Sequence, residues 1–144
     1  MIAPIIPPQT PLQELIHGPL PTTPTVRPAD RDVVYGICTV GDCGRVLDKL
    51  GFAALGWRPG NRLELTRLDA GVLLARPALH GQTTIAASGY FRIPYRLRRQ
   101  VSLFVGDRTL LIGHRTRNQL LIHPPAALDE LCAASLRLLE AVRR

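Results

Sequence analysis

Arginine is the residue type whose number and spacing in this chain point to chemistry. Of the 18 basic residues, Lys49 is the one lysine, and the net charge of the 144 residues is +7. Seven arginines and one acidic residue lie within residues 80–124, which therefore carry +6 of that charge. Four of the arginines are close together, at Arg92, Arg96, Arg98 and Arg99. A guanidinium holds a phosphate, or the edge of a guanine, through two parallel hydrogen bonds.

This concentration of positive charge favours a polyanionic partner, and DNA or RNA is the usual one. The alternative is an arginine-rich face that is only solvated, with a composition set partly by codon usage.

Catalytic and metal-binding patterns are absent from the sequence. The acidic residues are scattered, and no motif of a metalloprotease, a serine hydrolase or a phosphate-binding loop occurs. His114 and His123 flank an expected hairpin and could approach each other, although surface or capping histidines are the simpler interpretation. Cys38, Cys43 and Cys132 form no C-x-x-C pair and are expected to be buried free thiols. We therefore expect neither an enzyme nor a metal site or cofactor.

The first 32 residues differ in composition from the rest of the chain. They hold eight of the 13 prolines, which disfavours long helices and strands. We expect residues 1–32 to form a flexible or polyproline arm, in which residues 12–16 could make one helical turn that docks on the domain or on a partner. The sequence shows neither a signal peptide nor an apolar run long enough for a membrane span, so a cytoplasmic protein is expected.

Residues 33–124 alternate short β patterns with glycine turns. Strands are expected over 33–40, 45–47, 62–68, 72–76 and 90–93, and short helices over 50–55 and 95–102. Pro94 favours the start of the second helix, because its fixed φ suits the first helical residue. Trp57 is expected to be a core residue.

Landmarks of these elements recur once along the chain. Gly44 and Gly89 are 45 residues apart, and Gly60-Asn61-Arg62 matches Gly106-Asp107-Arg108 with a separation of 46. Leu73-Leu74 matches Leu120-Leu121 with a separation of 47. The pattern predicts two repeats, residues 33–79 and 80–124.

Residues 125–144 predict a C-terminal amphipathic helix. Asp129 and Glu130 stand in its first turn and arginines stand at its end, as the helix dipole favours. Its apolar stripe is wider than a small domain needs for packing. We expect a homodimer through Leu131, Leu138, Leu139 and Val142.

The segment G-Y-F-R-I-P, followed by Y-R-L-R-R and G-D-R, resembles the AbrB-type DNA-binding motif. That family includes SpoVT, the MazE antitoxins and MraZ, and two tandem copies resemble the MraZ arrangement. The resemblance implies a mainly β fold with some α: two swapped-hairpin repeats that form one small barrel, each with a short helix.

The resemblance also implies which residues contact double-stranded DNA. The motif arginine is Arg45 in the first repeat, and the paired basic residues of the helix are Arg98 and Arg99 in the second. Tyr90, Ala53 and Ala54 occupy the reciprocal positions, and Lys49 stands in place of the motif proline. The two repeats would therefore contribute different groups to one face, and Arg92 and Arg96 lie close enough in sequence to supplement it.

Two functions follow as hypotheses. The first is a nucleoid-associated, DNA-binding transcriptional regulator. The second is an antitoxin-like or scaffold module with weak or lost DNA binding, which holds a protein partner through its arm or its C-terminal helix.

Overall fold

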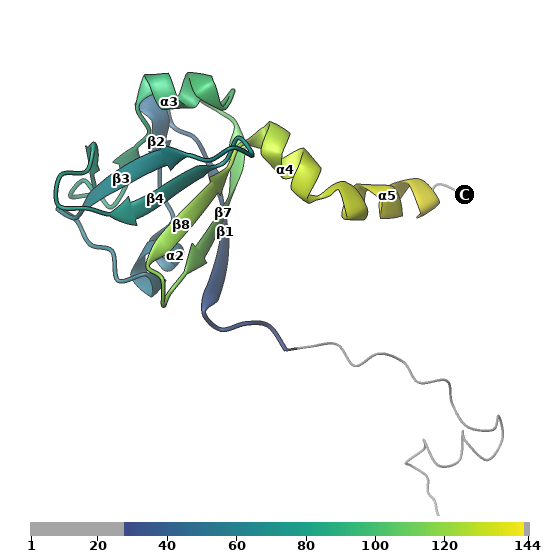
Figure 1. Ribbon diagram of the computed structural model, residues 1–144, viewed down its shortest axis with the longest axis horizontal. Helices are drawn as coiled ribbons and strands as arrows, with labels where there is room; N and C mark the ends of the chain where they lie inside the picture. The colour runs from purple at the N-terminus through teal and green to yellow at the C-terminus, as the bar shows by residue number, and fades with distance from the viewer. Residues whose placement is uncertain (1–27, 143–144) are drawn as a thin grey trace, which may run out of the picture.

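Two β-hairpins and the short segments that precede them build the fold (Figure 1). The computed structural model describes residues 28–142, so the expected arm lies outside the described residues up to residue 27. The elements in chain order are β1 (Val33–Thr39), η1 (Asp42–Gly44), β2 (Arg45–Val46), α2 (Lys49–Ala54), β3 (Arg62–Arg67), β4 (Leu73–Pro77), β5 (Thr83–Thr84), β6 (Phe91–Arg92), α3 (Tyr95–Gln100), β7 (Arg108–His114), β8 (Gln119–His123), α4 (Pro125–Leu131) and α5 (Ala133–Val142).

Six of the strands form an antiparallel sheet in the order β1-β7-β8-β4-β3-β5. Strands β1 and β5 are its edges and do not pair with each other, so this sheet is open. The small barrel that the resemblance implies is therefore not confirmed, since no sheet closes on itself among residues 28–142. The strand pairing of β5 with β3 covers two residues, and hydrogen bonds between Ile85 and residues 60–61 extend the contact. The fold is mixed, with a sheet and short helices.

The remaining strands, β2 and β6, pair with each other as a separate two-residue ribbon. Val46 and Phe91 face each other in this ribbon and are fully buried. They belong to one core cluster with the inward-facing residues of the six-stranded sheet and with side chains next to and within the helices, including Phe52, Ile93 and Leu103. The core therefore lies between the inner face of the sheet and the layer made by the ribbon and its neighbours.

Trp57 belongs to this core, as predicted. Its ring centroid lies 5.6 Å from that of Phe52, and its indole N–H donates to the Asn118 side chain over 2.6 Å. Because Asn118 is in the β7–β8 turn, this bond ties the first half of the chain to the second.

The strands that open the two halves each pair with the hairpin of the other half. Thr39 of β1 lies opposite Arg108 of β7, and Thr84 of β5 lies opposite Arg62 of β3. Backbone hydrogen bonds continue both pairings in the same way, from Val40 N–H to Asp107 (2.8 Å) and from Ile85 N–H to Asn61 (2.9 Å). The two halves are thus interlocked by matching contacts, although β1 has seven residues and β5 has two.

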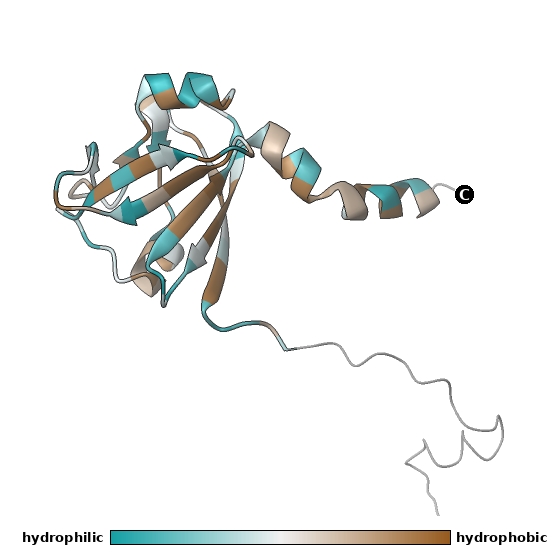
Figure 2. Ribbon diagram, viewed as in Figure 1, coloured by the Kyte–Doolittle hydropathy of each residue, from teal (hydrophilic) through white to brown (hydrophobic). Residues whose placement is uncertain are grey.

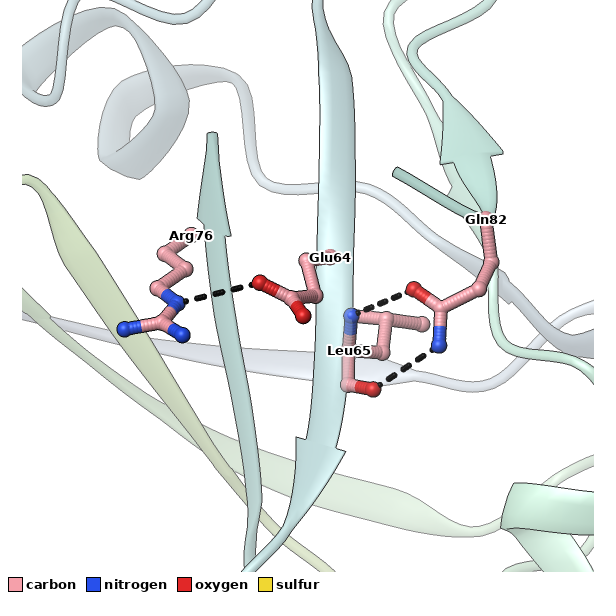
Figure 3. Close-up of polar contacts among 4 residues, drawn as sticks. All are labelled: Glu64, Leu65, Arg76 and Gln82. Atoms are coloured by element: carbon pink, nitrogen blue, oxygen red, sulfur yellow. Dashed lines mark hydrogen bonds and ion pairs between the residues drawn. The ribbon is translucent and has the colours of Figure 1, made fainter. Parts of the chain in front are cut away.

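A glutamine side chain extends the sheet beyond the short strand β5 (Figure 3). The Gln82 amide accepts a hydrogen bond from the Leu65 N–H (2.8 Å) and donates one to the Leu65 carbonyl (3.0 Å). It thereby occupies the place of a neighbouring strand residue on β3. On the other side of β3, Arg76 contacts Glu64 at 3.3 Å.

The C-terminal segment forms two helices where one was predicted for residues 125–144. The α4 helix begins directly after Pro124 and ends at Cys132, whose backbone leaves the helical region, and α5 follows. The α4 helix starts against β7 and β8, and α5 extends away from the body of the molecule (Figure 1). Within the described residues, no helix has the length and apolar character required to cross a bilayer.

Candidate nucleic-acid interface

The β2–β6 ribbon presents two arginines on its outer side. Because successive side chains of a strand alternate in direction, the buried pair Val46 and Phe91 requires its neighbours to point outward. Arg45 and Arg92 lie opposite each other in the ribbon, and both are exposed. Two residues 47 positions apart in the sequence are thereby brought into one surface.

Tyr90 holds this pair of arginines together. The guanidinium carbon of Arg45 lies 4.9 Å from the centre of the Tyr90 ring, and that of Arg92 lies 5.2 Å from the same centre. Each cation–π contact at an exposed site contributes about 0.5–1 kcal/mol. The ring therefore keeps two like charges side by side without a carboxylate between them.

The α3 helix carries the other predicted arginines. Arg96 and Arg99 are exposed, and the guanidinium carbons of Arg98 and Arg99 lie 5.4 and 5.8 Å from the ring of Tyr95. Pro94 directly precedes this helix as its N-cap residue, so the predicted helix start is displaced by one position.

Arg98 differs from the other arginines because it is half-buried and hydrogen-bonded to the backbone. Its Nε donates to the Ile93 carbonyl over 3.0 Å. The same side chain lies over Gly44, where a Cβ would have no room: it would stand 2.7 Å from the Arg98 Nε and 2.6 Å from the Ile93 carbonyl oxygen. Arg98 thus connects α3 to the turn that precedes Arg45, which makes it a positioning residue as well as a cation.

The interface is composed of groups from both halves of the chain. Gly44 accepts a hydrogen bond from the Ile93 N–H (2.9 Å), and this contact places the turn before β2 beside the start of α3. The predicted residues Arg45, Arg92 and Arg98 are therefore brought together here, with Arg96 and Arg99 exposed on the adjoining helix.

Few carboxylates compensate this charge. Among residues 28–142, the one ion pair within 4.0 Å joins Arg76 to Glu64, on β4 and β3. Two of the nearby acidic residues have local roles: Asp48 caps α2 by accepting from the Gly51 N–H (3.1 Å), and Asp107 accepts from the Phe104 N–H (2.8 Å). Asp42, in η1, is exposed and has no basic partner within 4.0 Å among the described residues. The interface arginines are consequently available to an anionic ligand.

Within the described residues, the histidines and cysteines do not gather in one place, and the exposed Cys43 lies in η1, two residues before Arg45. His114 and His123 do not meet, because their opposite residues in the β7–β8 pairing are Gln119 and Leu110. His123 is buried, not a surface or capping histidine, and its Nδ1 has no hydrogen-bond partner among the described residues. Burial lowers the pKa of the His123 imidazole below its ordinary value of 6.5.

The cysteines are free, but only Cys38 is buried, whereas all three were expected to be. Burial raises the pKa of the Cys38 thiol, whose sulfur accepts a bond from the Leu47 N–H over 3.4 Å. No group of three or more potential metal ligands gathers within the described part of the chain.

Two tyrosines of the interface are not among the residues that the sequence predicted to bind DNA. The motif identifies Tyr90 only as a departure from its arginine, and Tyr95 only as a helical residue. The signal that could have found Tyr90 is its position next to the buried Phe91, since alternation directs it outward with Arg45 and Arg92.

The residues predicted for dimerisation are all exposed: Leu131, Leu138, Leu139 and Val142.

Comparisons of the chain with protein-family models, with curated proteins and with solved structures found no match. The function of the chain is therefore inferred from its own residues.

Proposed function

We propose that this chain is a DNA-binding transcriptional regulator of the AbrB type, in which residues 33–79 and 80–124 are two interleaved swapped-hairpin repeats. Such a regulator acts on the nucleoid in the cytoplasm. The observation that carries the proposal is the paired placement of Arg45 and Arg92 over one tyrosine ring, beside the arginines of α3.

The reciprocal strand pairing supports the interleaved arrangement. The opening strand of each half pairs with the hairpin of the other, and the two pairings use residues 45 or 46 positions apart. A second pair of bonds obeys the same relation, from Gly106 N–H to Val40 (2.8 Å) and from Gly60 N–H to Ile85 (2.7 Å). The two halves of one chain would then exchange strands with each other, as two separate chains do in a swapped-hairpin dimer.

The chemistry of the surface suits a phosphate backbone with local base contacts. The exposed guanidiniums provide bidentate donors for phosphate oxygens, and any of them that reaches the major groove can hold a guanine edge. Because the two halves contribute different residues, the contacts on the DNA are expected to be asymmetric within one chain.

The salt dependence of binding tests this function. Affinity for a fluorescent generic duplex would be measured by anisotropy at several salt concentrations. Each lost phosphate contact lowers the slope of log affinity against log salt by about 0.9. Arg45→Ala with Arg92→Ala should therefore flatten the slope by about 2 per chain and weaken binding to every sequence.

Arg67→Ala with Arg115→Ala is the matched control. It removes the same charge from two exposed positions, one at the end of β3 and one directly after β7, and it should leave the slope nearly unchanged. If both double variants change the slope equally, the positive charge acts without a defined interface. If the unaltered protein shows no salt-sensitive binding, the regulator function is wrong.

The second candidate function is an antitoxin-like or scaffold module that binds another protein. It is favoured by one observation, the exposed leucines of α5. A toxin-like partner would be expected to cover this helix and leave the arginine surface without a ligand.

A further inference from the structure

The outer face of the six-stranded sheet is apolar where such faces are usually polar. Tyr35, Ile112, Leu121 and Leu74 lie opposite one another in a row across β1, β7, β8 and β4. None of the four is buried, although leucines and other apolar residues that alternate with them on β7, β8 and β4 belong to the core. At the β1 edge, Tyr35 is 70% exposed and Ile37 is 51% exposed. Figure 2 colours these strands largely as hydrophobic.

This face is also hollowed. A cavity of about 320 Å³ opens beside the row, with Leu74, Ile112 and Leu121 in its lining. His114, Arg117 and Gln119 form polar parts of the same lining. The lining fits an apolar side chain that has a hydrogen-bonding or acidic neighbour.

The α5 helix is the complementary feature. None of its ten residues is buried, and Leu138 and Leu139 are each 66% exposed. Isolated helices shorter than about 12–15 residues are marginal in water, so a helix of this length requires tertiary packing for stability. The apolar residues of α5 therefore require another apolar surface to pack against, and no element among the described residues provides it.

The geometry of the C-terminal segment separates α5 from its own sheet face. Two consecutive prolines, Pro124 and Pro125, start α4 directly after β8, and α4 packs against β7 and β8. Beyond Cys132, α5 continues away from the body (Figure 1). Among residues 28–142, the helix and the sheet face are thus both uncovered and lie apart from each other.

We propose that α5 of one copy packs on the outer sheet face of a second copy, and that the exchange is reciprocal. In each chain, the second copy then covers both the α5 helix and the outer sheet face. The α5 helix carries one basic and one acidic residue, Arg137 and Glu140, and Glu140 can approach the basic rim around Arg117.

A contact between two α5 helices alone is a weaker solution. Ten helical residues span about 15 Å, with a diameter of about 10 Å, so the footprint is only ~150 Å² per chain. Reciprocal exchange uses both the helix and the sheet face of each chain, so it doubles this footprint to about 300 Å² per chain. The proposed dimer leaves the arginine surface open and does not depend on DNA binding.

Light scattering on the full chain over a range of concentrations tests the exchange. The expected mass is twice 15.8 kDa. The face variant is Tyr35→Ser with Ile37→Ser, and the helix variant is Leu138→Ser with Leu139→Ser. Each should raise the dissociation constant at least tenfold, while circular dichroism confirms that the fold is retained. Leu50→Ser with Leu79→Ser is the control, since it removes two leucines that are at least as exposed but lie outside both surfaces.

A mixture of the two variants distinguishes exchange from other contacts. The intact helix of the face variant can pack on the intact face of the helix variant. The mixture should therefore dimerise at concentrations at which each variant by itself is monomeric. A face variant that dimerises as well as the unaltered protein would show a helix-to-helix contact and overturn the proposal. A monomeric unaltered protein would overturn it as well, since α5 then packs in cis or awaits a different partner.

Discussion

Gly44 brings the two halves of the molecule into close approach. Its φ is +82°, and it lies against the Ile93 carbonyl and the Arg98 side chain. Gly44→Ala should destabilise the protein by about 3 kcal/mol or more, because left-handed backbone costs a non-glycine residue about 1–2 kcal/mol and the added Cβ would also displace α3. Urea unfolding measures this loss.

Gly56→Ala separates these two effects. Gly56 has a similar φ of +76°, but no atom lies within 4 Å of its added Cβ. Gly56→Ala should therefore lower the free energy of unfolding by only about 1–2 kcal/mol. Equal losses in the two variants would mean that the close approach at Gly44 contributes nothing.

Tyr90 orders the two arginines of the ribbon. In Tyr90→Leu the ring is lost while both guanidiniums remain, so DNA affinity should fall about fivefold with the salt slope unchanged. Anisotropy titrations measure both quantities. Tyr90→Phe keeps the ring and should bind as the unaltered protein does. Unchanged affinity in the leucine variant would contradict the ordering role.

His123 makes stability depend on pH. Its folded-state pKa is lowered by burial, so the unfolded chain binds more protons between the folded-state pKa and about 6.5. Stability is therefore complete above about pH 6.5 and falls as the pH decreases below it. The free energy of unfolding, measured by urea at about pH 5–8, should show this loss.

A substitution at His123 should remove this pH dependence of stability, whereas a substitution at another histidine should not. His123→Gln removes the titrating group and should flatten the dependence below about pH 6.5, even if the variant is less stable overall. His80→Gln, at an exposed histidine, should retain the slope of the unaltered protein. A slope that persists in His123→Gln would assign the acid sensitivity to other groups.

At the scale of the element, a single side chain completes the edge of the sheet. Gln82 bonds to both backbone groups of Leu65, beyond the two residues of β5. Gln82→Ala should cost about 1–2 kcal/mol in thermal or urea unfolding, because two partly buried hydrogen bonds are lost. Gln100→Ala, at an exposed residue of α3, is the comparison and should cost little. Equal stability of both variants would mean that the Gln82 contacts do not stabilise the edge.

At the scale of the whole molecule, neither half contains a complete sheet. β1 pairs with β7, and β3 pairs with β5, so each half supplies strands to the other. A fragment of residues 33–79 should therefore be unfolded or self-associated, as judged by light scattering and by the dispersion of its amide NMR spectrum. A well-dispersed monomeric spectrum from this fragment would contradict the interlocked arrangement.

Local patterns in the sequence were sufficient to place most of the elements. β-branched composition predicted the strand now seen as β1, and alternation with a glycine turn predicted the β3–β4 hairpin. The proline before Tyr95 predicted the start of α3 within one residue, and the helical spacing after residue 124 predicted an amphipathic C-terminal segment. These signals work because period, turn chemistry and backbone restriction act over a few residues. The concentration of arginines around residues 92–99 was visible for the same reason.

Tertiary structure alone decided how these elements meet. The sheet is open because its edge strands β1 and β5 do not pair with each other, and the two roles of Arg98 depend on Gly44, which is 54 residues away in the sequence. The burial of His123 and the sharing of Tyr90 by Arg45 and Arg92 likewise require particular neighbours. A periodic pattern specifies which side of a strand is apolar but not which strand lies beside it, because that choice is made by long-range packing across the whole core.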